Sequence, residues 1–200
     1  MLSAININDD QLKALVTGCI RNNRKSQETV YKMFYGKMMA VCRRYTRNDD
    51  QAKDILQDGF IKVFKNIDKF NFQGSFEGWV RRIIVNTAID FTRKAKTDYL
   101  LMNDGQKIED FENDLLDEQD EEEYESPFKV ADVIKGMEQL SNAYRTVFNL
   151  YVFENFSHQE IADALSISVG TSKSNLAKAR ANLKKILNKE LEKNHGESIK

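Results

Sequence analysis

Apolar residues recur every three to four positions along the first part of the chain, which is the spacing of amphipathic helices. Three helices are predicted before residue 68. Asp9 or Asp10 would cap the first, Ser26 would cap the second, and the third would follow residues 48–50, Asn-Asp-Asp. Each has one apolar face, so the three helices are expected to pack against one another.

A polar loop interrupts this pattern at residues 68–75, where the sequence is DKFNFQGS. Ser75 is the predicted N-cap of a fourth helix, and an apolar stripe runs along it from Phe76 to Phe91. Four helices with this much apolar surface are expected to form one compact bundle.

The helical pattern stops over residues 98–128 and resumes after Pro127. A helix with apolar residues between Val130 and Met137 is predicted first, and Ser141 would cap the next one. One proline and nine glycines leave little turn chemistry for a β fold. The predicted class is therefore all-α, with two small helical domains: a four-helix bundle and a helix-turn-helix domain.

Charge is strongly segregated along the chain, although the net charge is only −1. Residues 1–97 carry +8, residues 98–128 carry −12, and residues 129–200 carry +3. We therefore expect domains at residues 1–97 and 129–193, joined by a largely disordered acidic linker at residues 98–128 and followed by a tail at residues 194–200. Basic domains of this kind favour acidic partners such as nucleic acids.

Several classes of protein are disfavoured by the composition. No run approaches the roughly 20 apolar residues of a membrane span, and residues 1–10 lack the pattern of a signal peptide, so a cytoplasmic protein is expected. Cys19 and Cys42 lie on predicted apolar faces and are expected to be reduced core thiols. His158 and His195 are the only histidines, and no cluster has metal-ligand spacing. We predict neither a metal nor a cofactor.

Residues 156–187 are predicted to form two short helices joined by a tight turn. Ser157 and Glu160 have the spacing of a capping box, and Ser168 can cap the second helix. Polar and basic side chains that could donate to phosphates and base edges are placed away from its apolar stripe: Ser168, Thr171, Ser172, Lys173, Ser174, Asn175 and Lys178. The segment is either a DNA-binding helix-turn-helix or an αα-hairpin with a solvated basic face.

A second group of candidate nucleic-acid ligands lies in the loop near residue 70 and in the helix after it. The group combines aromatic, amide and basic side chains: Phe70, Asn71, Phe72, Gln73, Ser75, Arg82, Asn86 and Arg93. Aromatic rings stack on unpaired bases, and arginine contacts phosphates. Alternatively, Phe70 and Phe72 plug the loop and the arginines are merely solvated. For residues 70–73 both interpretations stay open, whereas Trp79 is expected in the core.

Three segments, taken in order, resemble one protein family. They are AKDILQDGFIKVF at residues 52–64, GSFEGWVRRIIVN at 74–86 and SHQEIADALSISVGTSKSNLAKAR at 157–180. Together with the acidic segment before the third, they are similar to bacterial extracytoplasmic-function (ECF) sigma factors, the RNA polymerase subunits that select promoters. The resemblance covers residues 27–96 and 130–189.

This resemblance implies three binding surfaces. The helix at residues 52–64 would dock on core RNA polymerase through Asp54, Gln57, Asp58, Phe60 and Ile61. The loop at residues 70–75, with Arg82, Asn86 and Arg93, would bind the opened −10 strand. The helix that begins at Ser168 would enter the major groove of the −35 element. A membrane-bound anti-sigma factor is a further partner that the family suggests.

Two positions depart from the family pattern. Ser172 stands where the family often has valine, and Asn175 stands where it often has a basic residue. The −35 sequence therefore cannot be carried over from relatives. The acidic linker, like that of the family, is expected to follow the path of nascent RNA, and in the free protein it would also screen the basic domains from DNA.

Two other functions are open to the residues alone. A conventional helix-turn-helix regulator would bind symmetric operators and would leave the aromatic loop without a role. A structural interaction module would show no steep salt dependence of DNA affinity. An enzyme is least supported, because the paired acids at residues 121–123 lie in the segment that is expected to be disordered and no glycine-rich phosphate loop is present. No small-molecule substrate is expected.

Overall fold

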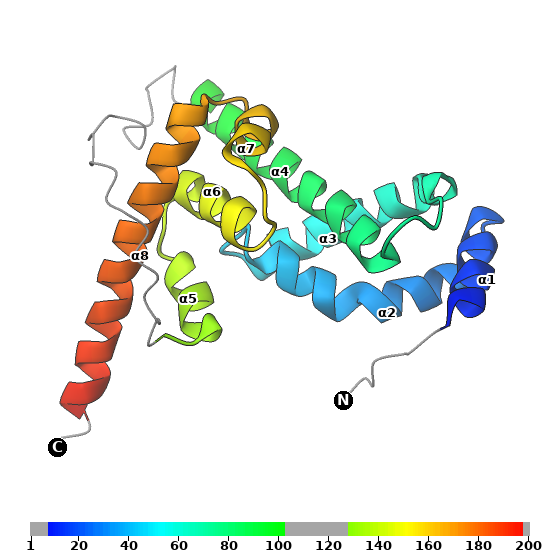
Figure 1. Ribbon diagram of the computed structural model, residues 1–200, viewed down its shortest axis with the longest axis horizontal. Coiled ribbons are helices and arrows are strands. Elements are labelled where there is room, and N and C mark those ends of the chain that lie inside the picture. The colour runs from blue at the N-terminus through cyan, green and yellow to red at the C-terminus, as the bar shows by residue number, and fades with distance from the viewer. Residues whose placement is uncertain (1–7, 103–127, 198–200) are drawn as a thin grey trace. The chain divides into compact units, whose positions relative to one another are not determined.

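The computed structural model describes residues 8–102 and 128–197, and within these ranges the chain is helical with no strand. It divides into two compact units, one up to Phe91 and one from Thr92 (Figure 1). The predicted all-α class with two helical units is confirmed. Residues 98–102 were expected in the disordered linker, but they are helical, so this part of the prediction was wrong. The expectations for residues 103–127, which are most of the acidic linker, and for the tail beyond residue 197 lie outside the described residues.

The first four helices are those predicted, and one short 3-10 turn precedes the last of them: α1 (Asp9–Ile20), α2 (Arg24–Arg43), α3 (Asp49–Lys65), η1 (Ile67–Lys69) and α4 (Phe76–Met102). The first unit includes α4 up to Phe91, and the helix continues into the second unit. Helix α2 packs against both α1 and α3. The rings of Phe34 and Phe76 meet edge to face at 5.6 Å and join α2 to α4. Gly59 lets α3 approach α4 closely, because a Cβ there would collide with the Ile84 side chain.

Two predicted N-caps were wrong. The Asn8 side chain, not that of Asp9 or Asp10, caps α1: it accepts from the Gln11 amide, and Gln11 bonds back to the Asn8 amide. Asn23 caps α2 and accepts from the amide of Ser26, which is therefore a first-turn residue. Asn, Asp and Ser all cap well, so neighbouring candidates cannot be ranked by residue type alone.

The second unit also has four helices, with these bounds: α5 (Val130–Met137), α6 (Asn142–Val152), α7 (His158–Leu165) and α8 (Val169–Glu197). Helices α5, α6 and α7 all pack against α8 (Figure 1). Leu140, Leu150 and Ile161 are almost fully buried between them. Ser141 caps α6 and Ser157 caps α7, as predicted. The unit is thus built around its last helix.

Candidate nucleic-acid and protein-binding surfaces

The loop between η1 and α4 holds one buried and one exposed phenylalanine. Phe70 is 5% exposed, and its ring lies 4.9 Å from that of Phe76 and 5.6 Å from that of Trp79. Phe72 is 43% exposed, and its ring lies 5.0 Å from Phe70. Phe70 is therefore a plug, as one of the two interpretations expected, whereas Phe72 presents an open aromatic face. Trp79 was expected in the core but is only half-buried, and its ring stacks on that of Phe76 with the centroids 5.9 Å apart.

The backbone of this loop is held in an unusual conformation. Phe72 has φ +60°, a region that a bulky side chain rarely adopts, and Gly74 follows at φ +86°. Asn71 accepts a hydrogen bond from the Gln73 amide at 3.1 Å, which closes a local turn. The Ser75 hydroxyl accepts from the Gly78 amide at 3.3 Å, as expected of a cap. The loop thus fixes Phe72 in an exposed position at the cost of backbone strain.

Helix α4 carries a polar stripe behind this loop. Arg82, Asn86 and Arg93 are all exposed, and their spacing places them along one side of the helix. Val80 and Ile84, on the other side, are completely buried. The stripe therefore faces solvent, and its guanidinium and amide groups are suited to phosphates and base edges.

The turn between α7 and α8 has the local chemistry of a helix-turn-helix. Ser157 and Glu160 form the predicted capping box of α7. Ser166 ends that helix in the left-handed conformation, with φ 54°. The Ser168 hydroxyl then accepts from the Thr171 amide at 2.9 Å, as expected of a cap at the start of α8.

The predicted polar residues of α8 fall into two groups. Lys173 and Ser174 are exposed, and Thr171 and Lys178 are half-buried. Ser172 is fully buried and Asn175 is 4% exposed, so their predicted position away from the apolar stripe was wrong. The helical spacing explains this: Ser172 lies one turn before Leu176, and Asn175 lies one turn before Ala179. Both belong to the inner face of the helix.

His158 was not predicted as a site residue, yet it joins α7 to α8. Its Nδ1 lies 2.9 Å from the buried Ser172 hydroxyl. Its ring stacks on Tyr151 with the centroids 4.8 Å apart. Burial, together with the positive charges of Lys173 and Arg180, holds the pKa of His158 below its ordinary value. No sequence signal identified this contact, because it depends on the crossing of two helices.

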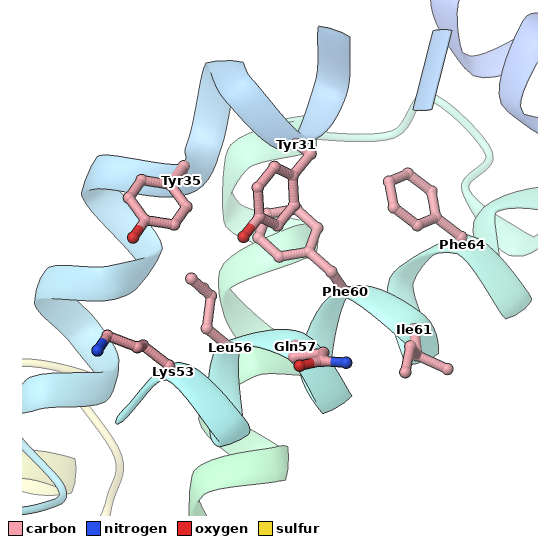
Figure 2. Close-up of a pocket in the computed structure, with 8 residues that line it drawn as sticks. All are labelled: Tyr31, Tyr35, Lys53, Leu56, Gln57, Phe60, Ile61 and Phe64. Atoms are coloured by element: carbon pink, nitrogen blue, oxygen red, sulfur yellow. The ribbon is translucent and has the colours of Figure 1, made fainter. Parts of the chain in front are cut away.

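A hollow between α2 and α3 provides a candidate protein-binding surface. Figure 2 shows it with the rings of Tyr31 and Tyr35 from α2 above residues of α3. Its volume is about 470 Å³, and it is lined by Tyr31, Tyr35, Lys53, Leu56, Gln57, Phe60, Ile61 and Phe64. The surface is predominantly apolar.

The predicted polymerase-binding residues lie in or beside this hollow. Gln57, Phe60 and Ile61 line it; Ile61 is 44% exposed, whereas Phe60 is buried beneath Tyr31 at a centroid distance of 4.7 Å. Asp54 and Asp58 are exposed on the same helix. The sequence did not single out the two tyrosines, since two aromatic residues four positions apart are usual on a helix.

The described residues contain neither a cluster of three or more His, Cys, Asp or Glu side chains that could hold a metal ion nor a helix long and apolar enough to cross a membrane.

Comparison with known families finds two matches, in chain order. Residues 30–97 match sigma-70 region 2, and residues 131–183 match sigma-70 region 4. The ECF RNA polymerase sigma factor SigW of Bacillus subtilis is 31% identical over 162 residues, which are 79% of this chain and 87% of that protein. The ECF RNA polymerase sigma-E factor of Haemophilus influenzae is 27% identical over 173 residues, 84% of this chain and 90% of that protein.

Among solved structures, the sigma factor RpoE of Bartonella quintana, in complex with the anti-sigma factor NepR, is similar to 80% of this chain. The match covers 96% of that chain, with 22% identity and a TM-score of 0.48.

Proposed function

Because this chain belongs to the ECF family of RNA polymerase sigma factors, we propose that it binds core polymerase and directs initiation at promoters through three separate surfaces. The first unit would bind the polymerase and the opened −10 strand, and the second would bind the −35 duplex. The family match does not favour the alternative of a conventional helix-turn-helix regulator.

Phe72 is the observation that best supports the −10 part of the proposal. A large aromatic side chain in a strained backbone conformation has no evident structural purpose when 43% of it is exposed. Stacking on an unpaired base would explain the exposed ring, and such stacking stabilises a complex by about 1–3 kcal/mol per base. Arg82, Asn86 and Arg93, exposed on α4, would contact the same strand, and buried Phe70 would support the Phe72 ring.

The proposed −35 surface is the exposed part of the first turns of α8. Lys173 and Ser174, with Thr171 and Lys178 beside them, would contact phosphates and base edges. Ser172 and Asn175 are buried, so we assign them to holding the helix in place rather than to base contacts. An alanine at Lys178 should weaken duplex binding and reduce its salt dependence.

The polymerase-binding surface is proposed to be the hollow between α2 and α3. It offers exposed apolar side chains such as Ile61 beside the carboxylates of Asp54 and Asp58. An apolar centre with a charged rim is the usual anatomy of a protein interface. The partner would need an apolar ridge flanked by basic groups.

The protein would act in the cytoplasm and without catalysing a reaction of its own, because base stacking and duplex binding can offset the cost of opening DNA. A membrane-bound anti-sigma factor stays a prediction.

The deciding experiment is an anisotropy titration of the full chain with sigma-free core polymerase. Wild type should bind tightly, and Asp58→Arg should weaken binding by at least about tenfold, since an exposed acid becomes a base in the interface. Asp68→Arg is the matched control, because Asp68 is an exposed acid in η1, outside the hollow. Equal affinity of the two variants would contradict the proposed surface, and no binding of wild type would contradict the proposed function.

A further inference from the structure

The bond between His158 and Ser172 joins the two helices of the helix-turn-helix at a point that matters for DNA binding. Nδ1 and Oγ are 2.9 Å apart, and Ser172 is fully buried. Ser172 lies in the same turn of α8 as Lys173 and Ser174, which are exposed. By holding Ser172 on the inner side of this turn, His158 therefore also fixes the direction of the side chains on its outer side.

The surroundings of His158 make this bond sensitive to charge. Tyr151 of α6 stacks on the ring at an interplanar angle of 26°, and the Arg180 guanidinium lies 5.7 Å from the centre of the Tyr151 ring. On α7 itself, the Glu160 carboxylate is bonded to the Ser157 amide and hydroxyl at 2.8 and 2.9 Å. The charges that act on the imidazole are those of Lys173 and Arg180, both from α8, and both disfavour the imidazolium form.

We infer that His158 is a positioning residue for the DNA-binding helix, acting through Ser172, and that DNA binding by this unit is coupled to uptake of one proton at His158. The inference rests on the proposed role of α8 in binding duplex DNA.

The coupling follows from where the positive charges lie. A DNA phosphate that approaches Lys173 offsets the positive potential at the imidazole, so protonation of His158 becomes easier in the complex than in the free protein. The proton comes from solvent and is bound at the ring nitrogen that carries none in the neutral imidazole, so that in the imidazolium form Nδ1–H donates to the Ser172 oxygen. The bond to Ser172 survives protonation, because the serine hydroxyl both donates and accepts.

The expected consequence is that duplex affinity increases as the pH falls. If the bound state holds more protons than the free state, acidification favours the bound state, by at most tenfold per pH unit for one proton. His158 and His195 are the only histidines in the chain. Since other side chains rarely titrate near neutral pH, a matched pair of histidine variants can isolate this effect.

The test is an anisotropy titration of the full chain with a labelled duplex at low ionic strength, between about pH 7.5 and about pH 5.5. The variants are His158→Asn, whose amide can still bond to Ser172, His158→Ala, and the control His195→Gln. Wild type and His195→Gln should gain about three- to tenfold more affinity over this range than His158→Asn. His158→Ala should bind about threefold or more weakly already at neutral pH, with His158→Asn close to wild type.

NMR titration of the imidazole signals gives a second readout that a purely structural role would not move. The pKa of His158 should rise when the duplex is added. Equal pH slopes for wild type and His158→Asn, or a His158 pKa that the duplex does not change, would overturn the inference while leaving the proposed function intact. Absence of any duplex binding by wild type would overturn both.

Discussion

The Arg145 guanidinium lies against the C-terminal end of α5, where its Nε donates a hydrogen bond to the Met137 carbonyl oxygen at 3.0 Å. Its Nη2 donates to the carbonyl oxygens of Glu138 and Leu140 at 3.2 and 3.0 Å. Arg145 is only 2% exposed. The Met137 carbonyl also accepts from the Leu140 amide at 3.1 Å, so Arg145 adds a second donor there. At Glu138 and Leu140 the same buried cation donates to carbonyl groups that follow the end of α5, and its positive charge interacts favourably with the negative end of the helix dipole.

Replacing Arg145 by methionine should destabilise the second unit by about 2–4 kcal/mol, because three carbonyl oxygens, those of Met137, Glu138 and Leu140, would each lose the guanidinium as a donor. Trp79, the only tryptophan, lies in the first unit. Unfolding followed by far-UV circular dichroism should therefore shift, while the transition followed by Trp79 fluorescence should not. Lys184→Met, at an exposed position of α8, is the matched control. A Trp79 transition that shifts equally would contradict this assignment.

Phe72 and Phe70 should respond to truncation in opposite ways. Phe72→Gly removes an exposed ring and relieves a left-handed backbone, so the free energy of unfolding should change by less than about 1 kcal/mol. Binding of the holoenzyme to a fork-junction promoter with an unpaired −10 strand should nevertheless weaken, by the about 1–3 kcal/mol of one stacked base.

Phe70→Ala is the contrasting variant. It removes a buried ring and should cost about 3–5 kcal/mol of stability, visible in Trp79 fluorescence because the two rings are in contact. A Phe72→Gly variant that keeps full fork-junction affinity would argue that the exposed ring has no role in holding the −10 strand.

The amphipathic pattern was sufficient to predict the helices, but it could not assign individual side chains to the inside or the outside. Apolar residues at helical spacing place each helix because burying them is the largest stabilising term. Ser172 and Asn175 are polar residues on the inner face, and only their distance of one turn from Leu176 and Ala179 could have revealed this.

Contacts between helices were the part of the site that was hardest to predict from the sequence. The hollow under Tyr31 and Tyr35 and the bond from His158 to Ser172 depend on which helices cross and at what distance. A single sequence gives the faces of helices but not their crossing points. The exposed Phe72 beside the buried Phe70 was a similar case, because a left-handed backbone at a phenylalanine has no signal in residue type.

Both cysteine thiols should react very slowly with alkylating reagents in the folded protein. Burial raises the pKa of the Cys19 thiol to about 11 and that of Cys42 to about 12. The thiolate is the nucleophile, so at about pH 8 alkylation by iodoacetamide should be at least about 100-fold slower than for an exposed cysteine. Both thiols should react fully in denaturant, as mass spectrometry would show. Rapid labelling of one thiol in native buffer would contradict its placement in a closed core.

Mild acid should destabilise the free second unit through His158. The folded-state pKa of this residue lies below its ordinary value, so near pH 6 the unfolded chain binds more protons than the folded chain. The stability linked to this group is therefore fully present above the unfolded pKa and is lost as the pH falls through the folded pKa.

The circular dichroism transition should thus move to lower denaturant between about pH 7.5 and about pH 5.5, and less so in His158→Asn, which has no titratable group at this position. His195→Gln should behave as wild type. A lower pH would then decrease the stability of the DNA-free protein and increase its affinity for duplex DNA. These opposite effects are expected if a DNA phosphate offsets the charge of Lys173 near the imidazole. An acid-induced loss of stability that is the same in wild type and His158→Asn would locate the titrating group elsewhere in the chain.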